Sequence, residues 1–222
     1  MLAERLAALR GEIDRELAVQ GRARESLSIL AVSKKQPLAA IREAYAAGLG
    51  HFGENYLQEA AEKFAPLRAE GLPLELHFIG HLQSNKAAKI AALVDCVQSV
   101  DREEAATALE RGAERAERIL PVLLQLNISP SERFGCLPAD AARLAERIRA
   151  HAHLRLDGVM AVAPITTDRG AISAAFEQAA KTFALVGGTT LSIGMSGDWR
   201  EAIAAGSTML RIGSALFGAR PS

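Results

Sequence analysis

Eight short apolar segments recur along the chain, and most are followed by a stretch with the periodicity of an amphipathic helix. The predicted strands cover residues 27–32, 49–53, 74–80, 96–100, 120–128, 154–160, 190–195 and 208–213. The predicted helices between them cover residues 38–48, 54–68, a short segment from 83, 101–118, 139–150, 170–186 and 198–205. Strands that alternate with helices at roughly 25 residues per unit are typical of a parallel (β/α)8 barrel.

A doubly wound open sheet is the main alternative to this TIM barrel. No GxGxxG motif follows the first predicted strand, so the sequence lacks the dinucleotide fingerprint that would favour the open sheet. Leucine or isoleucine at positions 2, 6, 9, 13 and 17 predicts an extra amphipathic helix before the barrel. We therefore expect a single barrel domain over residues 1–222, in which one extra N-terminal helix precedes the first strand.

Charge and cysteine content exclude several classes of protein. The 26 basic side chains balance 26 acidic ones, and no basic stripe stands out, so nucleic acid is not an expected partner. The N-terminus resembles neither a secretory signal nor a transit peptide, and no run of about 18 apolar residues suggests a membrane span. We expect a soluble cytoplasmic protein without a membrane partner, with Cys96 and Cys136 as buried thiols.

The first predicted strand ends in two lysines, Lys34 and Lys35, before Pro37 closes the turn. A lysine whose ammonium is partly buried has a lowered pKa, which makes the neutral amine available as a nucleophile for a carbonyl group. The alternative is that both lysines simply reach solvent. Because neighbouring residues of a strand point to opposite faces, only one of the two can point into a barrel.

Two glycine-containing turns suggest a site for an anion. Residues 194–198 (GMSGD) and 213–218 (GSALFG) follow the seventh and eighth predicted strands, where barrel enzymes commonly bind phosphate. With a lysine on the neighbouring first strand, a phosphorylated carbonyl compound such as pyridoxal 5′-phosphate becomes the natural ligand. Arg211 would then face the pyridine nitrogen, where a fixed cation disfavours ring protonation and suits holding the cofactor better than strong carbanion stabilisation.

Five motifs in order carry a resemblance to a known family: AVSK (31–34), FGENY (52–56), HFIGHLQSNK (77–86), GMSGD (194–198) and RIGSALFG (211–218). They closely resemble the pyridoxal phosphate homeostasis protein family over residues 27–219. The resemblance implies a single barrel similar to the N-terminal domain of alanine racemase. It also implies a protein that binds pyridoxal phosphate and regulates its supply, with no established catalytic activity.

The same resemblance implies a set of cofactor-binding residues. Lys34 is similar to the lysine that forms the aldimine with the cofactor, and Arg211 to the arginine at the ring nitrogen. A residue of the cofactor pocket is similar to Asn55, and the phosphate ligands of the family are similar to Ser196, Gly213 and Ser214. Three further residues would line the pocket: His77, Asn85 and Met195. No metal ligand and no catalytic residue is expected.

One loop departs from the family pattern. After residues 127–129 the family usually has an acidic, serine-containing loop with a lysine before glycine, whereas this chain has PSERFG at 130–135, shorter and with Arg133. Arginine keeps the charge but is a poor amine nucleophile because it stays protonated. Any role of that lysine in handing on the cofactor is therefore in doubt for this chain.

Three functions remain open at this point. The first is a pyridoxal-phosphate-binding protein that buffers the cofactor or delivers it to apo-enzymes, and that acts as a monomer. The second is a slow racemase, decarboxylase or lyase that uses the same pocket on amino acids. The third is an aldolase-type barrel that acts on sugar phosphates through a lysine, without pyridoxal phosphate.

Overall fold

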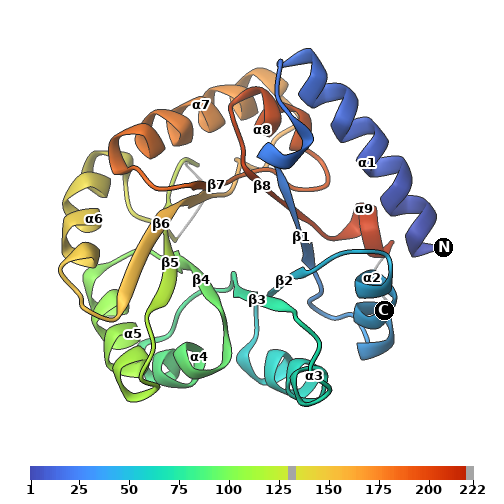
Figure 1. Cartoon of the computed structure of the whole chain (residues 1–222). Coiled ribbons are helices and arrows are strands. Elements are labelled where there is room, and N and C mark those ends of the chain that lie inside the picture. Colours follow the sequence, from blue (N-terminus) through green and yellow to red (C-terminus); the bar gives the residue numbers. More distant parts are fainter. Residues whose placement is uncertain (130–133, 219–222) are drawn as a thin grey trace.

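The strands of the computed structural model, which describes residues 1–129 and 134–218, close into one parallel barrel (Figure 1). The strands are β1 (Ser28–Val32), β2 (His51–Glu54), β3 (Glu75–Phe78), β4 (Cys96–Val100), β5 (Leu120–Leu126), β6 (Leu154–Ala161), β7 (Thr190–Ser192) and β8 (Met209–Ile212). Each strand pairs with the next, and β8 pairs with β1 from Ser28↔Met209 to Ala31↔Ile212. The predicted (β/α)8 barrel is confirmed, and the open sheet is excluded because β1 and β8 are joined.

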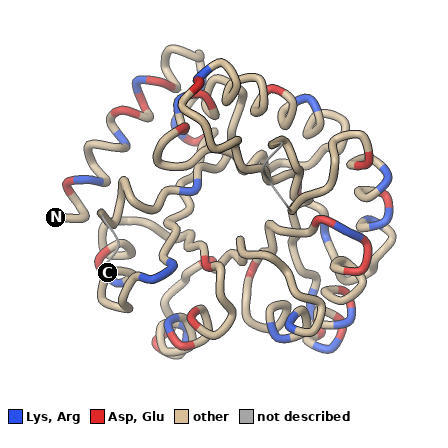
Figure 2. The backbone as a smooth tube through the Cα atoms, turned by 180° about the vertical axis from the view of Figure 1, so that it is seen from behind, with Lys and Arg blue, Asp and Glu red and all other residues tan. Residues whose placement is uncertain are grey.

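Helices surround the barrel as an outer ring (Figure 1). They are α1 (Leu2–Val19), α2 (Leu38–Ala46), α3 (Leu57–Ala69), α4 (Ala87–Leu93), α5 (Glu103–Arg115), α6 (Ala141–Arg149), α7 (Arg169–Val186), α8 (Trp199–Ala204) and α9 (Ser214–Phe217). Charged residues lie mostly on this ring, while the strands carry few (Figure 2). Among the described helices, none combines the length and the apolar character that a membrane crossing requires.

The predicted N-terminal helix is present as α1. Its five predicted apolar residues are all buried: Leu2, Leu6, Leu9, Ile13 and Leu17. Burying each aliphatic side chain contributes up to about 1.5–3 kcal/mol. Hydrogen bonds hold α1 to the helices on either side of it. Leu2 N donates to Glu43 on α2 (3.1 Å), and Arg5 Nε donates to the Leu216 carbonyl of α9 (2.7 Å). The helix therefore covers the seam where the last unit of the barrel meets the first.

The interior of the barrel is partly polar. His77, Gln98, Ser192 and Arg211 are all buried and are joined by hydrogen bonds: His77 Nδ1 to Gln98 Nε2 (2.8 Å), Gln98 Oε1 to Ser192 Oγ (2.8 Å) and Ser192 Oγ to Arg211 Nη1 (2.9 Å). Buried polar groups are stable only when they are paired in this way. The apolar core lies instead between strands and helices, as where Phe52 of β2 packs against Phe64 of α3 with ring centroids 5.8 Å apart.

Two predicted helix starts differ from the structure. Glu54 ends β2 rather than beginning a helix, because Ile79 N donates to the Glu54 carbonyl and keeps this residue in the sheet; α3 begins at Leu57. Asp101 is not the cap of α5, whose N-cap is Arg102. The Asp101 carboxylate instead accepts hydrogen bonds from Arg102 Nη1 (2.6 Å) and Gly135 N (3.4 Å).

Candidate cofactor site

The two lysines after β1 occupy different environments. Lys34 is partly buried, whereas Lys35 is exposed and adopts a positive φ of 61°. The turn is closed by a hydrogen bond from Gln36 N to the Ser33 carbonyl (3.0 Å) and is joined to β2 by one from Ser33 N to the Gly53 carbonyl (3.0 Å). The two lysine side chains therefore differ in exposure, and the Lys34 side chain is the more enclosed of the two.

A buried ionic cluster supports this turn from below. Lys63 of α3 is 8% exposed, and its Nζ lies 2.7 Å from each of three oxygens: the Ser33 carbonyl, Glu54 Oε1 and Glu59 Oε1. Ser33 Oγ also donates to Glu54 Oε1 (2.7 Å), and Lys35 N donates to Glu59. The ammonium and two carboxylates thus hold the backbone on both sides of Lys34.

The same cluster contains a carboxylate that is only partly satisfied. Glu54 is fully buried, and its Oε2 has no hydrogen-bond partner among the residues that the structure describes. Burial raises the pKa of Glu54, while the hydrogen bonds from Lys63 and Ser33 oppose that rise. We did not predict this cluster from the sequence. Lys63 lies four residues after Glu59, a spacing that a solvated helix face shares, so the pattern alone gave no sign of burial.

Asn55 follows β2 and provides an unpaired acceptor. Its Oδ1 is buried and has no hydrogen-bond partner in the described part of the chain. The backbone of Asn55 is held tightly against Gly80, where an added Cβ would lie 2.1 Å from the Asn55 carbonyl oxygen. Only glycine fits at this approach, and the Asn55 amide is available to a ligand that carries a hydrogen-bond donor.

The turn after β7 is built to present Ser196. Met195 N donates to Asp198 Oδ1 (2.5 Å), and Arg211 N donates to the Gly194 carbonyl (2.9 Å), which ties the turn to β8. Gly194 has a φ of +94°, and an added Cβ would lie 2.5 Å from the Cβ of Ala202, so the chain reverses here only with glycine. Ser196 Oγ accepts a hydrogen bond from Ala215 N (3.2 Å) in α9.

The turn after β8 lies between this serine and the end of β1. Gly213 is the N-cap of α9, and a Cβ built on it would lie 3.6 Å from the Cβ of Val32. Ser214, the first residue of α9, is exposed. The turns after β7 and β8 and the lysine turn after β1 are therefore consecutive around the barrel mouth, as the sequence predicts.

Arg211 of β8 is held inside the barrel. It is 4% exposed and donates to the carbonyls of Ser192 (2.5 Å) and Ala161 (2.7 Å) as well as to Ser192 Oγ. Burial lowers the pKa of its guanidinium to about 10, and the charge of Asp198 opposes that change. Arg211 is therefore a fixed cation at neutral pH, with three of its donors committed to the protein.

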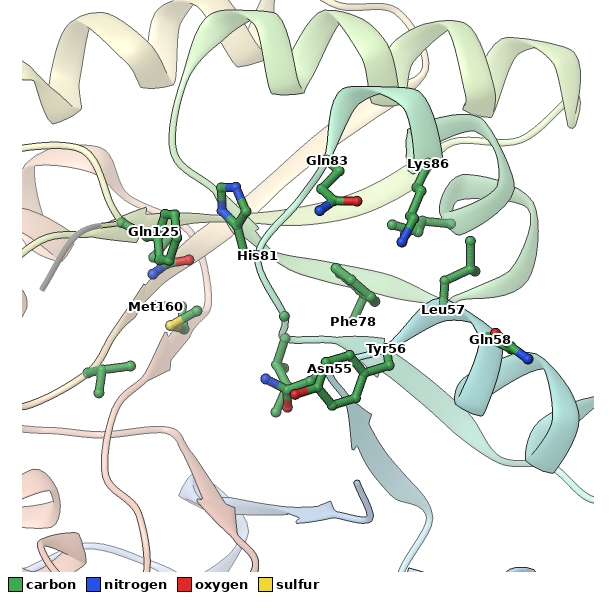
Figure 3. A pocket seen from close by; sticks show the side chains of 15 residues that line it. Asn55, Tyr56, Leu57, Gln58, Phe78, His81, Gln83, Lys86, Gln125 and Met160 are labelled. Carbon is green, nitrogen blue, oxygen red and sulfur yellow. The ribbon is translucent and has the colours of Figure 1, made fainter. Parts of the chain in front are cut away.

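A cavity of about 580 Å³ opens beside Asn55, at the ends of β2, β3, β5 and β6 (Figure 3). Of the predicted site residues, all of which lie in the described part of the chain, Asn55 is the one that lines it. Tyr56, Gln125 and Met160 also line it, and His81 closes one side by stacking on Phe134 with ring centroids 3.9 Å apart. We missed Gln125 because it lies within an apolar strand and carries no motif.

The three further candidates for lining the pocket lie in three different settings. His77 lies in mid-strand on β3, where its ring contacts Glu75 (3.0 Å) and Gln98 rather than the cavity. Asn85 is exposed in the 3-10 turn Ser84–Lys86, while its neighbours Gln83 and Lys86 line the cavity. Met195 is 36% exposed and lies in the turn that carries Ser196. Of the departing loop, residues 130–133 with Arg133 lie outside the described residues.

Comparison with known proteins decides the family. The model of the alanine racemase N-terminal domain family matches residues 12–221. The pyridoxal phosphate homeostasis protein of Pseudomonas aeruginosa is 45% identical over 222 residues, which cover 99% of this chain and 96% of that protein. The chain belongs to the pyridoxal phosphate homeostasis protein family. The member from Escherichia coli K12 is 41% identical over 99% of this chain and 97% of its own length.

Solved structures agree with this membership. PipY of Synechococcus elongatus, solved with PLP bound, superposes with a TM-score of 0.87 at 38% identity, over 98% of this chain and all of that one. Alanine racemase of Clostridium difficile has a TM-score of 0.70 at 14% identity, over 89% of this chain and 53% of the racemase. At that identity the racemase shows a common fold only. The pyridoxal phosphate homeostasis family thus shares the barrel of the racemase N-terminal domain.

Proposed function

We propose that this chain binds pyridoxal 5′-phosphate at the mouth of the barrel and holds it covalently through Lys34. The observation that carries the proposal is the adjacency of three turns, with Gly213 beside Val32 of the lysine strand and Ser196 bonded to α9. An amine and a phosphate site are then supplied from neighbouring strands. The PLP bound to the related PipY supports the same ligand.

Each residue has a distinct task in this proposal. Lys34 would supply the amine that condenses with the aldehyde carbon, whose oxygen leaves as water, and Ser196, Gly213 and Ser214 would bind the phosphate through a hydroxyl and backbone N–H groups. Asn55 offers its unpaired Oδ1 to the ring hydroxyl of the cofactor. Arg211 places its guanidinium toward the ring nitrogen, where a cation disfavours protonation.

We further propose that the chain stores the cofactor and passes it to apo-enzymes, and that it acts as a single-domain monomer without turnover of its own. A racemase requires acid–base groups on both faces of the substrate carbon. Lys34 can serve one face only. When bound, the cofactor supplies an electrophilic carbon and an electron sink, and a cation near the ring nitrogen weakens that sink.

One observation favours a second function, a slow racemase, decarboxylase or lyase. The cavity beside Asn55 has room for an amino acid, and the Tyr56 side chain borders it (Figure 3). A phenol at that position could move a proton on the face opposite Lys34. Steady consumption of an amino acid by the loaded protein, absent in both Lys34→Ala and Tyr56→Phe, would establish this alternative.

Binding is tested by titration with PLP and with pyridoxal, monitored by visible absorption. We expect Lys34→Ala to lose the covalent absorption band and at least about tenfold in affinity, while Lys35→Ala binds like the wild type. Pyridoxal lacks the phosphate and should bind more weakly to the wild type. Equal loss in the two lysine variants, or equal affinity for the two aldehydes, would contradict the proposal.

A further inference from the structure

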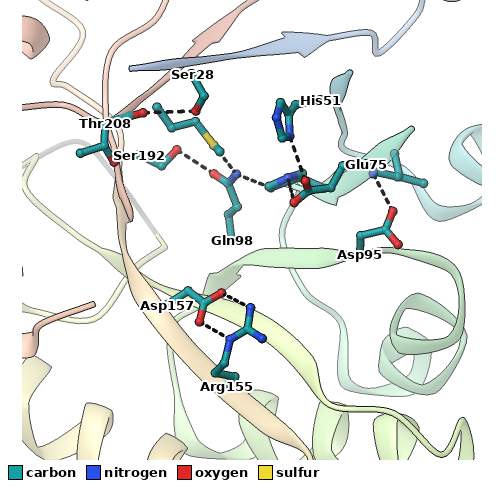
Figure 4. A network of polar contacts seen from close by, with 12 residues as sticks. Ser28, His51, Glu75, Asp95, Gln98, Arg155, Asp157, Ser192 and Thr208 are labelled. Atoms are coloured by element: carbon teal, nitrogen blue, oxygen red, sulfur yellow. Dashed lines mark hydrogen bonds and ion pairs between the residues drawn. The ribbon is translucent and has the colours of Figure 1, made fainter. Parts of the chain in front are cut away.

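At the opposite end of the barrel, three side chains that the cofactor site does not use converge on one point. Glu75 and His77 lie two residues apart on β3 and share its inward face, and His51 of β2 pairs directly with Glu75 in the sheet. One nitrogen or oxygen atom from each of the three lies within 4.8 Å of the other two. Figure 4 shows His51 and Glu75 facing one another, with Gln98 reaching toward them.

The distances within this His51–Glu75–His77 cluster suit a shared ion. His51 Nδ1 lies 3.0 Å from Glu75 Oε2, and His77 Nε2 lies 3.0 Å from Glu75 Oε1. Four ligands at about 2.0–2.2 Å from a tetrahedral metal stand roughly 3.3 Å apart, which is close to both separations. Small side-chain rotations would therefore bring the three atoms around one ion.

One contact within the cluster is poorly aligned for a hydrogen bond. His51 Nδ1 is buried and, although near Glu75, has no aligned hydrogen bond among the described residues. A buried ring nitrogen that lies 3.0 Å from a carboxylate oxygen without an aligned hydrogen bond leaves a place for an ion that would bind both atoms.

We propose that His51, Glu75 and His77 form a binding site for a divalent transition metal, zinc above all. Two imidazole nitrogens and one carboxylate oxygen are a donor set of zinc sites that keep a fourth position for water. Magnesium and calcium prefer ligand shells made of oxygen alone and would bind weakly here. Glu75 and His51 remain half-exposed, so an ion can enter from solvent at this end.

The surroundings supply the outer hydrogen bonds that such a site requires. His77 Nδ1 faces Gln98 Nε2 at 2.8 Å, so in the metal-free protein the other ring nitrogen carries the proton that Glu75 accepts. With a metal at Nε2, the ring proton would move to Nδ1, which would then become the donor. Rotating the Gln98 amide by half a turn would bring its oxygen to Nδ1, the carbonyl partner that metal-bound histidines commonly have.

The test is calorimetric titration of the chelator-treated full chain with zinc chloride. We expect one ion per chain, with affinity at least about tenfold lower in His51→Gln and in Glu75→Gln. Both side chains are half-exposed, so these variants should fold, and their thermal unfolding is measured alongside. The matched control is His153→Gln, because His153 also contacts a single glutamate (Glu110, 2.9 Å) but lies outside the cluster.

Two further measurements distinguish a metal site from a cluster held by hydrogen bonds alone. Cobalt in place of zinc should give the absorption of a four-coordinate ion in the wild type but not in His77→Asn. Lys34→Ala should retain full metal binding, because Lys34 lies at the other end of the barrel, so failure of the cofactor proposal leaves this one standing. No stoichiometric binding, or equal binding by wild type and His51→Gln, would overturn the metal site.

Discussion

The two ends of the barrel present ligand groups in different ways. At the C-terminal end, the groups lie on turns beyond the strands, where backbone N–H groups, a hydroxyl and the Lys34 amine are spread around the mouth. At the N-terminal end, the His51–Glu75–His77 cluster uses side chains of the strands themselves, within 4.8 Å of one another. Turns can surround an organic phosphate, whereas neighbouring strand residues converge closely enough for a single ion.

The ends also differ in how their charges are balanced. Under the Lys34 turn, the Lys63 ammonium is enclosed by Glu54 and Glu59 and is 8% exposed. In the histidine cluster, the Glu75 carboxylate is 46% exposed. A buried ion pair is costly to break, while an exposed one contributes little. The mouth should therefore depend far more on its ionic cluster for stability than the opposite end does.

The largest effect that separates the two ends is expected from Lys63→Met. Removing the ammonium leaves Glu54 buried without its cation, which should lower the free energy of unfolding by about 3–5 kcal/mol. Urea unfolding measures the loss. Replacing Glu54 by glutamine in the same chain should restore part of it, since the uncompensated charge is then gone. At the other end, His51→Gln should cost less than about 1 kcal/mol.

Ser196→Ala tests whether the mouth binds a phosphate. The variant removes the acceptor of Ala215 N, a hydrogen bond that contributes about 0.5–1.5 kcal/mol. We expect weaker binding of PLP with little change for pyridoxal, measured by absorbance titration. Zinc binding at the opposite end should be unaffected. An equal loss for both aldehydes would show that Ser196 does not contact the phosphate.

Glu54 predicts a pH dependence for the mouth. Burial raises the pKa of Glu54 in the folded protein above its value in the unfolded chain. The protonated carboxyl therefore stabilises the fold below the unfolded pKa, and this contribution is lost as the pH rises through the raised folded pKa. The stability of the wild type relative to Glu54→Gln should therefore decline as the pH rises from about 4 through the raised pKa of Glu54. Urea unfolding across this range measures it, with the exposed Glu62→Gln as control. A difference that grows with pH would contradict the assignment.

The smallest effect concerns the two thiols, one toward each end. Cys96 begins β4 and is buried, and this burial strongly raises the pKa of its thiol. Cys136 follows the C-terminal end of β5, at the barrel mouth, and burial raises the pKa of its thiol to about 11. Since the thiolate is the reactive form, a disulfide reagent at pH 8 should label Cys136 slowly and Cys96 only on unfolding. Equal rates in the native protein would contradict this order.

The sequence predicts the barrel well because short, largely apolar segments alternate with helical patterns, and the segment that forms Leu120–Leu126 is the most apolar of them. It predicts strand ends poorly. The sequence pattern places Glu54 at the start of a helix because the apolar residues after it, from Leu57 to Phe64, recur at helical spacing. In the structure it is a buried strand residue, because Lys63 and Ser33 provide its hydrogen bonds. Only the tertiary fold brings these residues together.

Contacts that form only in the tertiary fold also limit what the sequence predicts about the two proposed sites. Lys34, Ser196 and Gly213 each follow a strand, and the rule that strand ends meet at one face brings them together. His77 lies within β3 rather than after its end, and its ring contacts Glu75 and Gln98. The cluster with His51 depends on the register between β2 and β3, which no single-sequence pattern specifies.

The most direct test of covalent binding at the mouth is borohydride reduction of the protein after incubation with PLP, followed by digestion and mass spectrometry of the labelled peptide. We predict one pyridoxyl group per chain on Lys34, unchanged in Lys35→Ala and absent in Lys34→Ala. Labelling of Lys35 or Lys63 in place of Lys34, or the absence of any stable adduct, would contradict the central claim that Lys34 holds the cofactor.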